Sequence, residues 1–164
     1  MKALQLLLCA IFAALLVVAG APAASARATD DDDECRRVSA IGVGQDLGGG
    51  NTTATISRGG ILNGTTTAHF EITGGTGPVL TFAGTVVFTT KKGTLTVGIA
   101  GTFNIATGAF AASGPVTSGT GAFAGATGTL NFAGVENLTT GTFTETVKGR
   151  ICLDDGDDDE DDDG

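Results

Sequence analysis

The sequence predicts an all-β protein, a closed antiparallel up-and-down β-barrel of about eight strands. Three observations predict it. The chain of 164 residues contains 27 Gly and is almost as rich in Thr, with no Trp or Tyr, a composition that favours strands and turns over helices. Long segments alternate between apolar and polar residues, which is typical of half-buried strands. Gly-containing turns separate these segments.

The clearest alternation runs through the middle of the chain. Between Thr94 and Ile105 every second residue is apolar or Gly, and a similar pattern precedes it from Leu80 to Thr89. The connector Lys91-Lys92-Gly93 predicts a hairpin between these two strands, and Asn63-Gly64 predicts another hairpin upstream. The expected strands are 38–43, 52–62, 65–73, 80–89, 94–105, 108–116, 126–133 and 142–152.

The second half of the chain contains a repeat that leaves one architectural alternative open. A Gly followed two residues later by Phe recurs at equal intervals, at Gly101, Gly121 and Gly141. Such a unit could be one turn of a β-solenoid or one hairpin of a barrel. The first half does not keep this period, so we favour the barrel.

The two ends of the chain differ from its body. Residues 1–26 resemble a secretory signal peptide: Lys2 is followed by an apolar run, and small residues precede an expected cleavage after Ala26. The apolar run is short for a membrane span and no second run follows, so we expect no stable membrane anchor. We therefore expect an exported protein, extracellular or periplasmic. An acidic linker at 27–34, the barrel domain at 35–153 and a disordered acidic tail at 154–164 complete the predicted organisation.

Two cysteines remain once the predicted signal peptide and its Cys9 are removed. Cys35 and Cys152 lie at opposite ends of the Gly- and Thr-rich body, in a chain whose export would permit disulfides. A barrel brings its first and last strands together, so a Cys35–Cys152 bridge would join them. The alternative is two unpaired thiols.

Charge is segregated along the sequence. The net charge is −9, but most carboxylates lie in the acidic stretches at 30–34 and 154–163. The body lacks the dense basic patch with interleaved aromatic residues that nucleic acid binding needs. Asp159, Asp161 and Asp163 copy the opening of a calcium loop without its closing Glu, so we expect a solvated tail and no metal site. One His and three Cys are too few for a usual zinc cluster, and no cofactor is expected.

Three residues are candidates for chemistry. Glu145 shares a strand face with the apolar Phe143 and Val147, and a carboxyl in an apolar barrel would have a raised pKa suited to an acid or base. The alternative is a structural carboxylate near a barrel end. His69 and Glu71 share another face, where Glu71 could orient His69 as a general base. A solvated outer face is the favoured alternative for this pair.

Residues 118–128, Ser-Gly-Thr-Gly-Ala-Phe-Ala-Gly-Ala-Thr-Gly, resemble a motif of the allene oxide cyclase-like barrels, the fold shared with plant dirigent proteins. The segment 148–151, Lys-Gly-Arg-Ile, is similar to the closing strand of that family, and 81–103 to its long hairpin. The resemblance covers roughly residues 38–152. It implies an eight-stranded barrel, a homo-oligomer and a substrate cavity without a cofactor. The cyclase pocket uses a Tyr that this chain lacks, so no catalytic residue carries over. Small exported bacterial proteins rich in Gly and Thr are the closer resemblance.

Three functions are compatible with these observations. The first is a secreted binding or scaffold module for a small apolar ligand. The second is a cofactor-free isomerase or cyclase that acts in the barrel cavity, and the third is a structural β-solenoid at a surface. A barrel interior that is hollow would favour the first two, whereas a solidly packed one would exclude them.

Overall fold

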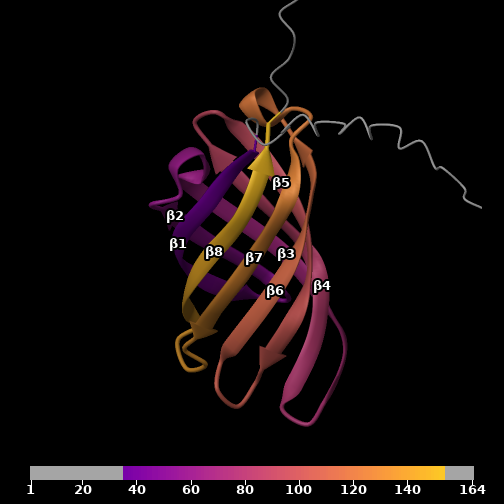
Figure 1. Ribbon diagram of the computed structural model, residues 1–164. Coiled ribbons are helices and arrows are strands. Elements are labelled where there is room, and N and C mark those ends of the chain that lie inside the picture. Colours follow the sequence, from indigo (N-terminus) through magenta and orange to yellow (C-terminus); the bar gives the residue numbers. More distant parts are fainter. Residues whose placement is uncertain (1–34, 154–164) are drawn as a thin grey trace, which may run out of the picture.

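The last strand of the sheet pairs with the first and closes it into a barrel. The computed structural model describes residues 35–153, in which eight antiparallel strands follow one another in sequence order (Figure 1). The strands are β1 (Cys35–Gly48), β2 (Asn51–Ser57), β3 (Gly64–Thr76), β4 (Val79–Thr90), β5 (Gly93–Asn104), β6 (Ala109–Gly119), β7 (Thr127–Glu136) and β8 (Thr142–Cys152). The predicted fold class is confirmed, and the solenoid alternative is wrong because β8 pairs with β1 from end to end. The predicted signal peptide, acidic linker and acidic tail lie outside the described residues.

The only helical elements between residues 35 and 153 are two short 3-10 turns, η2 (Gly60–Leu62) and η3 (Gly121–Phe123). Neither is long enough to cross a bilayer. The turn η2 corrects one expectation, because β2 ends at Ser57 and no tight hairpin forms at Asn63-Gly64. The chain leaves the strand through Arg58, whose φ of 59° is left-handed, and the Asn63 side chain accepts a hydrogen bond from the Gly59 N–H at 2.8 Å. The predicted hairpin at Lys91-Lys92 is confirmed.

A disulfide joins the two ends of the barrel domain. Cys35 and Cys152 are directly opposite each other in the β1–β8 ladder, with their Cα atoms 3.8 Å apart, and form a bridge across 117 residues of chain. The predicted pairing is confirmed, and the alternative of two free thiols is wrong. We call the end of the barrel that carries this bridge the disulfide end, and the opposite end, at the turns after β1, β3, β5 and β7, the open end.

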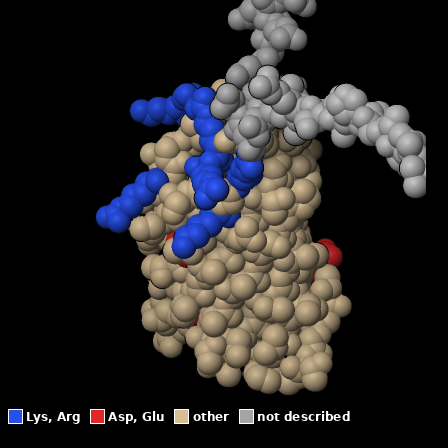
Figure 2. All heavy atoms as spheres, in the orientation of Figure 1, with Lys and Arg blue, Asp and Glu red and all other residues tan. Residues whose placement is uncertain are grey.

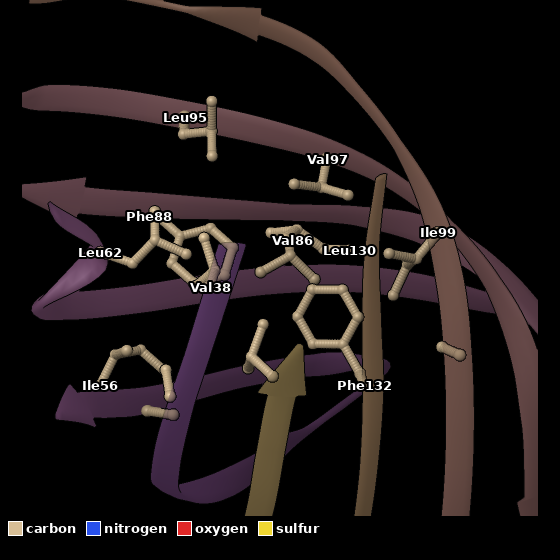
Figure 3. Packing of buried hydrophobic residues seen from close by; sticks show 14 of the residues in the cluster. Val38, Ile56, Leu62, Val86, Phe88, Leu95, Val97, Ile99, Leu130 and Phe132 are labelled. Atoms are coloured by element: carbon tan, nitrogen blue, oxygen red, sulfur yellow. The ribbon is translucent and has the colours of Figure 1, made fainter. Parts of the chain in front are cut away.

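Apolar side chains fill the half of the barrel near the disulfide end. Both 3-10 turns connect strands at this end, and each contributes one fully buried side chain, Leu62 or Phe123. Figure 3 shows side chains from several strands pointing toward one another across the interior. The fully buried side chains are Leu62, Phe88, Leu95, Val97, Phe123, Leu130, Val147 and Ile151. This half therefore has a solid core like that of a small filled barrel.

Candidate binding site

The open half of the barrel is hollow. A cavity of about 540 Å³ occupies it and reaches the turns at the open end, where Gly49, Gly50 and Leu138 line it. Its walls are mainly aromatic and aliphatic. The phenylalanines in its lining are Phe70, Phe82, Phe103, Phe110, Phe132 and Phe143. Apolar walls with few polar groups are typical of sites for small molecules.

Glycines on neighbouring strands let the aromatic rings lie against the wall. Gly44 of β1 is directly opposite Phe143 of β8, and the ring tip of Phe143 occupies the space where a Gly44 Cβ would stand. Gly134 of β7 is likewise opposite Phe110 of β6, whose Cζ would lie 2.5 Å from a Gly134 Cβ. The Phe110 and Phe143 rings meet edge to face, with centroids 5.9 Å apart. Rings that cover glycines stay at the wall, and the centre of this half remains open.

A second aromatic pair lies on the neighbouring strands β3 and β4. The ring centroids of Phe70 and Phe82 are 5.2 Å apart and the rings are tilted by 44°. Phe70 is opposite Gly84 in the β3–β4 ladder, where an added Cβ would collide with the Phe70 backbone and Cβ. The same combination of an inward Phe and a facing Gly therefore recurs on this side of the barrel.

Glu145 is the carboxylate on the inner wall of β8. It is half-buried, between the inward-facing Phe143 and Val147, and lines the cavity as the alternation predicts. It is directly opposite Gly42 on β1 and Gly134 on β7. Burial raises the pKa of Glu145 to about 7, and no neighbouring charge or hydrogen bond within residues 35–153 offsets that effect. The catalytic role of Glu145 stays a prediction.

Two carboxylates at the open end were missed by the sequence reasoning. The expected strand 126–133 ended before Glu136, but Glu136 is the last residue of β7, half-buried, and lines the cavity. Burial raises the pKa of Glu136 and the negative charge of Asp46 raises it further. Asp46 lies near the end of β1, lines the cavity, and accepts a hydrogen bond from the Gly48 N–H at 2.8 Å. Alternate residues of β1 face inward, and Asp46 is one of them. This alternation could have predicted that Asp46 lines the cavity.

The structure separates His69 from the cavity. His69 is exposed on the outside of β3, and its Nδ1 lies 3.1 Å from Oδ1 of Asn51 on β2. Glu71 is also exposed but lines the mouth of the cavity. Asn51, not Glu71, is thus the side-chain neighbour of the imidazole. This geometry gives no support to a base formed by His69 and Glu71.

Exposed apolar side chains surround the open end. They lie at the ends of strands or in the turns of that end, and 39–63% of their surface is accessible. These residues are Leu47, Ile72, Val79, Ile105 and Leu138. Exposed apolar residues gathered at one place on a protein often mark a site of interaction.

Within residues 35–153, no group of three or more His, Cys, Asp and Glu side chains is placed to hold a metal ion. Comparisons with protein-family models, curated proteins and solved structures found no match to this chain. The resemblance to the allene oxide cyclase-like barrels therefore stays a prediction.

Proposed function

We propose that this protein is an exported binding module that holds a small, largely apolar molecule in the open half of its barrel. One observation carries the proposal, namely the uneven filling of the interior. Buried apolar side chains fill the disulfide half, whereas the same barrel leaves about 540 Å³ open in the other half. An eight-stranded barrel can be filled by its own side chains, so packing alone does not require the cavity.

The dimensions and walls of the cavity suit a small ligand. Its volume falls within the range of about 300–1,000 Å³ that is usual for small-molecule sites. At about 0.3 kcal/mol per heavy atom, a ligand of about 20 heavy atoms would bind with about 6 kcal/mol, a Kd of some tens of micromolar. The apolar residues around the mouth, such as Leu47 and Leu138, would continue the apolar path to the surface.

A neutral fluorescent probe tests the proposal. N-phenyl-1-naphthylamine becomes brighter in apolar surroundings, and we expect saturable binding to the full exported chain. Ala112 is buried in the cavity wall of β6, so Ala112→Leu should obstruct the cavity and weaken probe binding at least about fivefold. The neighbouring Ala111 is exposed outside the barrel, and Ala111→Leu is the matched control. Equal binding by the two variants, or no saturable binding by the wild type, would contradict the proposal.

A second candidate function rests on Glu145. A half-buried carboxylate whose pKa is raised to about 7 by burial suits general acid–base catalysis at neutral pH, as in a cofactor-free isomerase. The probe 5-nitrobenzisoxazole tests it: a carboxylate removes the C3 proton, the N–O bond breaks, and a cyanophenolate forms. Turnover should rise with pH through about 7 and disappear in Glu145→Gln but not in Glu71→Gln. Turnover unchanged in Glu145→Gln would reject this candidate.

Export is part of the proposal. The Cys35–Cys152 disulfide supports it, because disulfides persist mainly in oxidising compartments such as the periplasm and the cell exterior. Mass spectrometry of the secreted protein tests it, since the mature chain should begin at Arg27. A secreted chain that retains residues 1–26 would contradict the predicted cleavage. Assembly into an oligomer stays a prediction from the family resemblance.

A further inference from the structure

The charges of the barrel are divided between its two ends. Within residues 35–153, every Asp and Glu lines the cavity: Asp46, Glu71, Glu136 and Glu145. No Lys or Arg lines it. On the face shown in Figure 2, the basic side chains gather over the half with the disulfide end and leave the other half free of them. The basic residues of the described part are Arg36, Arg37, Arg58, Lys91, Lys92, Lys148 and Arg150.

From this distribution we infer that the ligand is an amphipathic cation, with an apolar body and a positively charged nitrogen that lies near Glu145. The inference rests on the proposed function and specifies the chemical class of its ligand. The apolar body would contact the aromatic walls, and the cationic group would supply the opposite charge that the described part of the cavity lacks.

The position of Glu145 makes a cation the complementary partner. Glu145 lies on the inner wall between Gly42 and Gly134, with its carboxylate over Gly42, and it lines the cavity together with the Phe110 and Phe143 rings. A carboxylate removed from water without a partner is unfavourable, and a bound cation would offset that cost. The aromatic faces add attraction for a cation, most strongly for quaternary ammonium groups.

The other charged groups of the cavity act in the same direction. Asp46 on β1 and Glu136 on β7 lie close enough for the charge of Asp46 to raise the pKa of Glu136, and Glu71 on β3 lines the mouth. A cation that enters the cavity therefore meets only negative charges in the described part of the lining. An anion of the same shape would be repelled by all of them.

Binding of a cation must also be linked to the proton on Glu145. The bound cation favours the ionised carboxylate, so it lowers the pKa of Glu145 from about 7 and displaces the proton. The affinity for a cation should therefore fall as pH falls below about 7, by at most about tenfold per pH unit for this one carboxylate. A neutral ligand should not show this dependence.

Three probes of matched shape test the inference on the full exported chain. They are phenylbutyl-trimethylammonium, which is cationic at every pH, the neutral alcohol phenylbutanol, and the anion phenylpentanoate. Binding is measured by displacement of N-phenyl-1-naphthylamine and by calorimetry. At about pH 8 the ammonium ion should bind at least about tenfold more tightly than the alcohol, and the anion most weakly.

Two variants separate charge from shape. Glu145→Gln should weaken binding of the ammonium ion at least about tenfold, remove most of the pH dependence, and leave the alcohol within about twofold of the wild type. His69→Gln removes the single His, which lies on the outer face, and should leave all three affinities and their pH dependence unchanged. The wild-type pH series is a test that needs no variant.

The outcomes distinguish the two proposals. If the alcohol binds in the cavity but the ammonium ion binds no more tightly, or if its affinity does not fall with pH, the inferred ligand class is wrong and the binding function stands. If neither the naphthylamine nor any of the three probes binds, the proposed function fails and the inference fails with it.

Discussion

Gly42 on β1 lies directly opposite Glu145 on β8, and a Cβ added to Gly42 would lie 2.7 Å from both the Cγ and the Oε1 of Glu145. The glycine thus provides the space in which the carboxylate lies. The three atoms nearest to that added Cβ all belong to the Glu145 side chain, so no other group competes for this space as closely. The two residues form one structural unit on the cavity wall.

Gly42→Ala should therefore destabilise the fold through Glu145. An added methyl group must displace the carboxylate, and overpacking of this kind costs about 1–3 kcal/mol. In a Glu145→Ala background the same substitution should cost at least about 1 kcal/mol less, because the colliding side chain is gone. Denaturant unfolding of the four proteins in this double-mutant cycle measures the difference. If the two substitutions lower the free energy of unfolding additively, the proposed collision between a methyl group at position 42 and the Glu145 side chain is contradicted.

The stability of the fold should depend on pH through Glu145. Its pKa is raised from 4.5 to about 7 in the folded protein, so the folded state holds the proton more tightly than the unfolded chain. The resulting stabilisation is complete below about pH 4.5 and is lost as pH rises through about 7, with an upper limit of about 3 kcal/mol. The free energy of unfolding of the wild type, minus that of Glu145→Gln, should fall by up to this amount between about pH 4.5 and about pH 8. Parallel pH profiles would show that the carboxyl group is solvated.

Replacement of a phenylalanine by alanine should lower the free energy of unfolding more in the disulfide half than in the open half. Phe123 is fully buried in a solid core, and Phe123→Ala should cost about 3–5 kcal/mol. Phe110 is half-buried and faces an existing cavity, so Phe110→Ala should cost at least about 1 kcal/mol less. Equal losses in the free energy of unfolding would mean that the two halves are packed alike.

The disulfide should contribute strongly to stability. It closes a loop of 117 residues between the two ends of the barrel domain, and constraint of the unfolded chain over such a loop contributes about 4–5 kcal/mol. Cys35→Ser and Cys152→Ser should lower the Tm by similar amounts, and the reduced wild type should match them. A Tm that does not change on reduction would show that the pairing of β1 with β8 keeps the barrel equally stable without the disulfide.

Much of the fold could be predicted because it depends on local patterns. Alternation along 94–105 and 142–152 fixes which side chains face inward, and this placed Glu145 on the same face as Phe143 and Val147. Closure of the expected barrel brings its first and last strands together, and this predicted the bridge between Cys35 and Cys152. These features need only the two-residue repeat of a strand and the adjacency of the first and last strands in a barrel.

The residue pattern alone could not predict the cavity, because its existence depends on how side chains from different strands share space. Gly44 and Gly134 determine that the facing Phe rings lie against the wall, and this pairing requires the register between strands. Glu136 was missed because β7 extends to this residue, beyond the expected strand 126–133. The hairpin expected at Asn63-Gly64 failed because the η2 turn buries Leu62 in the core, a tertiary contact that outweighs local turn preference.

The central claim is that only the open half of the barrel accepts a ligand. An NMR titration of the isotope-labelled full chain with neutral phenylbutanol tests it most directly. The account predicts saturable shifts for the Phe110, Phe143 and Glu145 resonances in the cavity, with those of Leu62 and Phe123 unchanged. Shifts spread evenly over both halves, or confined to the outer face of the barrel, would contradict it.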